Sequence, residues 1–141
     1  NGIMREVYES QRLSMPQEVE LRLQMPEDTS LIMKTDVVRL KQVINNLINN
    51  AKKFTTQGYI SIGYEKKTIG FVELFVEDTG KGMSQEALEH IFERFYKVDS
   101  FTQGAGLGLS ICQTFVDRMS GTISVTSEVG KGTRFVVKLP I

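Results

Sequence analysis

The stretch Leu40–Thr55, LKQVINNLINNAKKFT, limits the possible folds most, because it has the pattern of one amphipathic helix. Its apolar residues recur at helical spacing and predict one buried face: Leu40, Val43, Ile44, Leu47, Ile48, Ala51 and Phe54. Beside that face runs a polar stripe of Gln42, Asn46, Asn50 and Lys53. Asn costs a helix roughly 0.5 kcal/mol relative to Ala. Four Asn between positions 45 and 50 therefore indicate either a solvated face with a chance run of amides or a functional use of them.

Composition narrows the class of protein. A chain of 141 residues fits one domain with its own core. With 17 basic and 17 acidic residues, we expect no nucleic-acid partner and no direct membrane contact. No apolar run approaches the ~20 residues that span a bilayer, and no signal-peptide pattern opens the sequence. One Cys and one His exclude an internal disulfide framework and a Cys/His metal site, so any metal should be a hard cation bound by oxygen.

Periodicity and turn residues predict the order of elements. Helices are expected at 3–13, 36–55, 84–90, 91–95 and 104–119, and strands at 19–25, 31–33, 59–64, 71–76, 122–127 and 133–139. The strands pair as hairpins, and the helices gather between them. This order favours a two-layer α+β sandwich over a parallel doubly wound sheet.

Asp78 is a candidate binding residue because it stands at a predicted strand end before Gly80 and Gly82. These glycines let the backbone approach a flat ligand, and the carboxylate can accept a hydrogen bond from an exocyclic amine such as that of adenine. An ordinary Asx-turn after a strand is the simpler interpretation. Asp78-Thr79-Gly80 also matches the aspartic protease triplet, but those enzymes are all-β and the long predicted helices argue against them.

The glycines at 104, 106 and 108 open a predicted helix, which suits phosphate binding by backbone N–H groups and the helix dipole. The spacing is neither a Rossmann fingerprint nor a Walker A loop. Gly130-Lys131-Gly132-Thr133 also misses the Walker A pattern, because Gly132 occupies the Ser/Thr position.

In sequence order, these motifs resemble those of one family, the catalytic ATP-binding domain of sensor histidine kinases, in the wider group of DNA gyrase, Hsp90 and MutL ATPases. The matching segments are Asn46–Thr55 (N box), Asp78–Met83 (first glycine box), Ile91–Lys97 (F box), Gly104–Ser110 (second glycine box) and Gly130–Thr133 (terminal glycine motif). The resemblance runs from about Val19 to Pro140, and five boxes in the right order are highly specific. It implies a Bergerat-type ATP-binding fold, a two-layer α/β sandwich whose mixed, mainly antiparallel sheet is covered on one face by helices.

The resemblance also implies roles for individual residues. Asn46, Asn50 and Lys53 would be the catalytic residues, with Asn50 coordinating Mg²⁺, Asn46 near the phosphates and Lys53 against a phosphate. The remaining ATP-binding residues would be Phe54, Asp78, Gly80, Gly82, Met83, Lys97, Gly104, Gly106, Leu107, Gly108, Leu109 and Thr133. Among these, Asp78 would take the adenine amino group with Thr133 beside it, Lys97 would reach the γ-phosphate, and 104–109 would close over the phosphates. Residues 83–103 would form a mobile lid.

Gln42 separates branches of this group, because the ATPases have a water-activating Glu in the matching region. Gln cannot take a proton at neutral pH, so the resemblance favours transfer of the ATP γ-phosphoryl group to an unprotonated imidazole, which needs no base. His90 lacks the following acidic residue of an acceptor, so we interpret it as a surface or packing residue. We interpret Cys112 as a small buried apolar residue.

The resemblance finally implies a domain organisation and partners. Residues 1–15 would be the end of a linker or helix from a preceding dimerisation domain, and 16–141 the ATP-binding catalytic domain. The acceptor His would lie on that dimerisation domain of the same protein, with a response regulator downstream, and the domain would be cytoplasmic. Two alternatives stay open: a non-catalytic nucleotide-binding or scaffolding module, and a related serine kinase or ATPase module.

Overall fold

The computed structural model describes residues 2–13, 15, 18–24, 37–55, 57–65, 70–90 and 108–140. Its strands are β1 (Val19–Gln24), β2 (Gly58–Glu65), β3 (Phe71–Asp78), β4 (Thr122–Glu128) and β5 (Gly132–Pro140). Its helices are α1 (Gly2–Arg12), α2 (Val37–Phe54), α3 (Gln85–His90) and α4 (Gly108–Arg118). The predicted strand at 31–33 and the predicted helix at 91–95 lie outside the described residues.

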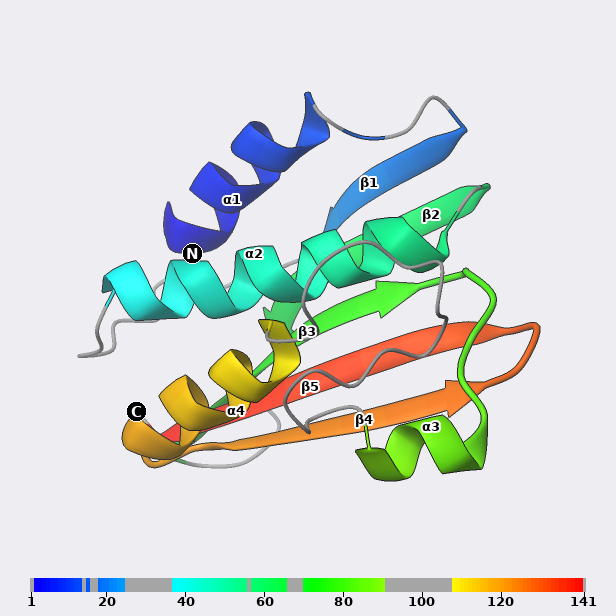
Figure 1. Cartoon of the computed structure of the whole chain (residues 1–141). Coiled ribbons are helices and arrows are strands. Elements are labelled where there is room, and N and C mark those ends of the chain that lie inside the picture. Colours follow the sequence, from blue (N-terminus) through cyan, green and yellow to red (C-terminus); the bar gives the residue numbers. More distant parts are fainter. Residues whose placement is uncertain are drawn as a thin grey trace.

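The strands form one sheet in the order β1-β2-β3-β5-β4. The β1–β2 pair is parallel and the other three pairs are antiparallel. Helices α1, α2 and α4 lie over the same face of this sheet (Figure 1). The prediction of a two-layer sandwich with a mixed, mainly antiparallel sheet is therefore confirmed.

The core lies between the helices and the covered face of the sheet. Alternate residues of the inner strands point into it, as the side-chain period of two requires. Buried core side chains include Val43, Ile44, Leu47 and Ile48 of α2, Ile60 and Ile62 of β2, Val72, Leu74 and Val76 of β3, and Phe135, Val137 and Leu139 of β5. The apolar face predicted for α2 is thus the face that packs on the sheet at Leu40, Val43, Ile44, Leu47, Ile48 and Ala51. The Phe54 side chain, also predicted on this face, lies outside the described part of the structure.

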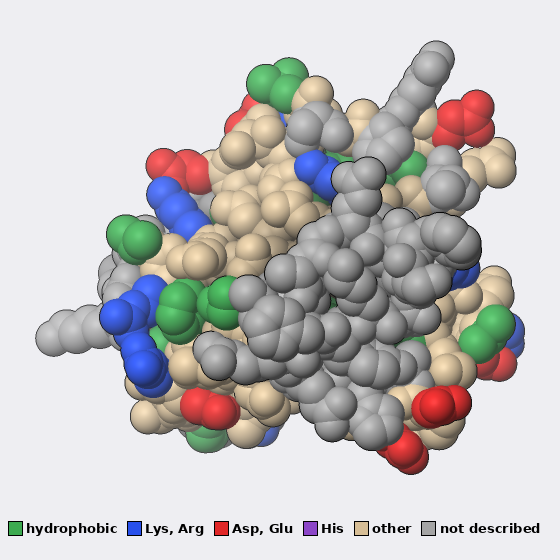
Figure 2. All heavy atoms as spheres, in the orientation of Figure 1, with side chains coloured by type: hydrophobic (Ala, Val, Ile, Leu, Met, Phe, Trp, Pro, Cys, Tyr) green, Lys and Arg blue, Asp and Glu red, His purple; other side chains and the backbone are tan. Residues whose placement is uncertain are grey.

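The opposite face of the sheet carries aromatic rings covered by cations. The Arg22 guanidinium lies 3.9 Å from the Tyr59 ring centre, and the Arg134 guanidinium lies 4.4 Å from that of Phe75. Such contacts let a sheet carry large apolar side chains on a face without helices. Acidic and basic side chains are interspersed on the described part of the surface seen in Figure 2.

Helix α1 packs into the same core as the rest of the chain, since Met4 and Val7 are buried in it. The assignment of residues 1–15 to a segment from a preceding domain stays a prediction. Among the described residues, none of the helices combines the length and apolar character needed to cross a membrane.

Candidate nucleotide-binding site

Three polar residues form one cross-strand row at the end of the sheet where β3 stops. Asp78 pairs with Thr133 across β3 and β5, and Thr133 pairs with Ser127 across β5 and β4. Directly opposed residues place their side chains on the same face, ~5 Å apart. Asp78 is 4% exposed and Thr133 is 5% exposed, so a carboxylate and a hydroxyl are buried side by side at the edge of the core.

Burial raises the pKa of Asp78 above its ordinary value of 3.8. Donors from three segments oppose part of this rise: the Gly80 N–H, the Thr55 hydroxyl and the Thr133 N–H. The Gly80 N–H donates to Asp78 Oδ1 at 2.8 Å, so the Asx-turn considered from sequence does form. The turn therefore fixes the position of the buried carboxylate.

The Thr55 hydroxyl also belongs to this site, at the end of α2. Thr55 is 1% exposed, and its Oγ1 has no hydrogen-bond partner among the described residues. It lies close enough to Asp78 to lower the pKa of that carboxyl group. A buried unpaired hydroxyl of this kind costs about 1–3 kcal/mol, so it favours a bound polar group.

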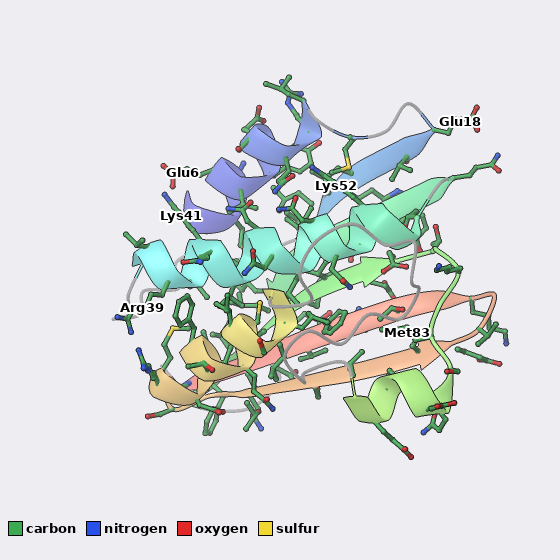
Figure 3. All side chains as sticks on the ribbon, in the orientation of Figure 1. Glu6, Glu18, Arg39, Lys41, Lys52 and Met83 are labelled. Carbon is green, nitrogen blue, oxygen red and sulfur yellow. The ribbon has the colours of Figure 1, made fainter. Side chains whose placement is uncertain are left out.

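The loop after Asp78 is fastened to the β4–β5 turn. The Met83 N–H donates to Ser127 Oγ at 2.8 Å, and the Gly130 N–H donates to the Lys81 carbonyl at 2.8 Å. Figure 3 shows Met83 at this end of the sheet, where the chain leaves toward α3. Gly82 has φ +73°, and a Cβ on it would lie 2.1 Å from the Glu128 carbonyl oxygen. The close approach of two backbones therefore requires glycine here.

The four asparagines of α2 divide into two rows. Gln11 Nε2 of α1 donates to Asn45 Oδ1 at 2.7 Å and to Asn49 Oδ1 at 3.4 Å, and Lys52 Nζ donates to Gln11 Oε1. The first row is therefore part of the α1–α2 contact, and Figure 3 places Lys52 beside α1.

The second row begins with Asn46, which lies on the side of α4, and Asn50 follows one helical turn later on the same face of α2. The Asn46 amide lies beside the Cys112 thiol, which also donates to the Val43 carbonyl at 3.7 Å. Burial raises the pKa of Cys112 to about 12. Cys112 is thus a buried packing residue, as the sequence predicts, and it fixes α4 against the amide row.

Comparison with known proteins identifies the family. Residues 35–141 match the family described as histidine kinase-, DNA gyrase B-, and HSP90-like ATPase. The chain belongs to this family. Sensor protein SrrB of Staphylococcus aureus is 44% identical over 110 residues, in an alignment that covers 74% of this chain and 19% of SrrB. The chain therefore spans only 19% of the length of that relative.

Solved structures narrow the relationship to histidine kinases. The full-length structure of ShkA in complex with AMPPNP is 32% identical with a TM-score of 0.89, over 99% of this chain and 29% of that chain. A catalytic-domain structure of the histidine kinase ThkA is 31% identical with a TM-score of 0.82, over 99% of this chain and 92% of that chain. The chain is thus similar along almost its whole length to the catalytic domain of a histidine kinase.

Not every residue expected from the kinase motifs is described. Lys97, Gly104, Gly106 and Leu107 lie outside the described residues. Lys53 and Phe54 lie in the last turn of α2, Gly108 is the first residue of α4, and Leu109 packs half-buried against the core. Asp78, Gly80, Gly82, Met83 and Thr133 come together at the sheet end, while their roles in ATP binding stay predictions.

Two residues of this candidate site were missed from sequence. Thr55 closes the N-box segment, so its place beside the asparagines and lysine was the signal that could have marked it. Ser127 offered no comparable signal, because its importance depends on the register between β4 and β5.

Proposed function

We propose that this domain binds Mg-ATP and passes the γ-phosphoryl group to a histidine on the dimerisation domain of its own parent protein. The observation that carries the proposal is the convergence of Thr55, from the end of α2, and Thr133, from β5, on the buried Asp78 carboxylate at the end of β3. The complex of the structurally similar ShkA with AMPPNP, an adenine nucleotide, supports an adenine nucleotide as the ligand.

The adenine end of the proposed site is the Asp78 row. An ionised carboxylate is an acceptor with no donor of its own, so Asp78 suits the amino group of adenine. The unpaired Thr55 Oγ1 can bond to the base or to a water beside it. Both groups pair fully only when a ligand or water supplies the missing partners.

The phosphate end of the proposed site is the Asn46 and Asn50 row, with Lys53 in the next turn. Amide oxygens suit a hard cation such as Mg²⁺ and add no negative charge beside a triphosphate. The donor chemistry therefore fits the metal, with Asn50 as its ligand and Asn46 next to the phosphates. When bound, Mg²⁺ would neutralise charge on the phosphate oxygens.

The residues of α2 favour transfer over hydrolysis. This helix, VVRLKQVINNLINNAKKF, contains neither Asp nor Glu, and Gln42 is exposed on it. No carboxylate of α2 can therefore activate a water. A neutral imidazole attacks phosphorus without a base, so the helix needs only to position the phosphates. We infer that the downstream partner is a response regulator and that the domain acts in the cytoplasm.

Phosphotransfer to a separately prepared dimerisation domain of the parent protein, with γ-labelled ATP and Mg²⁺, tests the proposal. We expect label on the acceptor histidine, stable to alkali and labile to acid. Asn50→Ala should lower Mg²⁺-dependent ATP affinity by about 10-fold or more. Asn49→Ala, one residue away and bonded toward α1, is the matched control and should retain transfer.

Three results would contradict parts of this account. Tight ATP binding without transfer would favour a scaffolding module. Acid-stable phosphoserine or vigorous phosphate release would favour a serine kinase or an ATPase. Normal Mg-ATP binding by Asn50→Ala would remove Asn50 as the metal ligand.

A further inference from the structure

The hydroxyl of Ser127 makes three contacts that fix the direction of every hydrogen bond around it. Its Oγ lies 2.8 Å from the Met83 nitrogen, 2.9 Å from the Gly132 carbonyl oxygen and 2.9 Å from Thr133 Oγ1. A serine hydroxyl has one proton and two lone pairs. The three contacts therefore use its full hydrogen-bonding capacity.

The Gly132 carbonyl decides where the Ser127 proton lies. A carbonyl oxygen can only accept, so the 2.9 Å contact is favourable only if Ser127 donates to it. The Met83 N–H can only donate, so Ser127 accepts from it. One lone pair then remains on Ser127, and Thr133 must donate to it.

This assignment determines what Thr133 offers to a ligand. Its single proton is committed to Ser127, so its oxygen has only lone pairs for other partners. Thr133 is also the cross-strand neighbour of Asp78, whose carboxylate is an acceptor. The row beside the proposed adenine position therefore consists of acceptors alone.

We propose that Ser127 is a positioning residue for base selectivity, which holds the Thr133 proton so that Asp78 and Thr133 together select an amino-bearing purine over a 6-oxo purine. This inference rests on the proposed adenine nucleotide site. A 6-amino group supplies the two N–H donors that such a row accepts. A 6-oxo group would place its lone pairs against theirs, which is unfavourable in a buried site.

The test compares the dissociation constants of ATP and ITP by calorimetry, because ITP differs from ATP only in carrying a 6-oxo, N1-protonated base. In Ser127→Ala the Thr133 hydroxyl is free to turn and donate. The ITP-to-ATP ratio of dissociation constants should therefore fall by about 3- to 10-fold. Ser127→Thr keeps the hydroxyl and should restore the ratio. Ser124→Ala, on the exposed side of β4, is the matched control and should leave it unchanged.

A structural role alone predicts a different result. If Ser127 only supports the β4–β5 turn, Ser127→Ala will weaken ATP and ITP by the same factor, and the selectivity proposal is then wrong. Thr133→Val gives a second test that keeps the Ser127 bonds to Met83 and Gly132. Its selectivity should also fall, and an unchanged ratio would overturn the proposal even if Ser127→Ala fails to fold. Absence of ATP binding by the unaltered domain would instead refute the proposed function.

Discussion

Replacing Gly82 by Ala tests whether the loop after Asp78 is held by close backbone contact. Gly82, Gly130 and Gly70 have φ values of +73°, +83° and +84°, so an Ala at any of them carries the same left-handed strain of about 1–2 kcal/mol. At Gly130 and Gly70 an added Cβ meets nothing within 4 Å. At Gly82 it would lie 2.1 Å from the Glu128 carbonyl oxygen and 2.8 Å from the carbonyl carbon.

The contact at Gly82 can be relieved only by moving one backbone away from the other by more than about 1 Å. That movement would break two bonds of 2.8 Å, from the Met83 N–H to Ser127 Oγ and from the Gly130 N–H to the Lys81 carbonyl. Their loss adds about 1–3 kcal/mol to the strain. Gly82→Ala should therefore lower the free energy of unfolding by about 2–5 kcal/mol, against about 1–2 kcal/mol for Gly130→Ala.

Urea unfolding followed by circular dichroism measures these differences directly, and calorimetry with ATP measures the effect on the site. Because the displaced loop begins at Asp78, Gly82→Ala should also weaken ATP binding by about 10-fold or more. Gly70→Ala, at the β2–β3 turn, should leave binding unchanged. Equal destabilisation by Gly82→Ala and Gly130→Ala would show that φ strain alone matters and that the backbone contact does not.

Three further predictions concern buried groups. Asp78→Asn should weaken ATP binding by about 10- to 100-fold in calorimetry, and raise the Tm at neutral pH because a buried charge is removed. Folding raises the pKa of Asp78, so the protonated carboxyl contributes stability below pH 3.8, and this contribution is lost as the pH rises through the folded pKa. The gain in Tm from Asp78→Asn should therefore vanish in acid, where Asp78 is already neutral. Cys112, with its pKa near 12, should react with a thiol reagent at pH 8 more than about 1,000-fold slower than in urea. Gln11→Leu should cost about 1–3 kcal/mol in urea unfolding, because Asn45 and Lys52 each lose a bond to its side chain; an unchanged midpoint would contradict this.

The sequence predicted the fold because each element carries a strong local signal. Alternation along β3 and the 3.6-residue period of α2 specify which faces are buried, and both faces pack as expected. Asp78 was also predictable, since a strand end followed by two glycines is a local pattern. A binding residue whose signal lies within one segment, such as Asp78, could thus be identified from that segment alone.

The contacts between distant segments could not be predicted in this way. Gln11 is separated by 34 residues from Asn45, and nothing in either segment specifies the bond between them. Ser127 and Thr133 are close in sequence, but their pairing depends on the length and conformation of the β4–β5 turn. A one-residue shift of register would move Ser127 to the opposite face of the sheet.

The asparagines of α2 show how the two kinds of information combine. Their helix penalty left open a chance run of amides or a functional use of them, and the structure divides the four into two pairs. Asn45 and Asn49 accept hydrogen bonds from Gln11 of α1, and these tertiary contacts offset their low helix propensity. Asn46 lies on the side of the helix where α4 packs, and Asn50 follows it one turn later on the same face, where the proposed phosphates would lie. Alanine at Asn45 should therefore lower stability and spare ATP binding, whereas alanine at Asn50 should spare stability and weaken binding. The same substitution in one helix then separates packing from function.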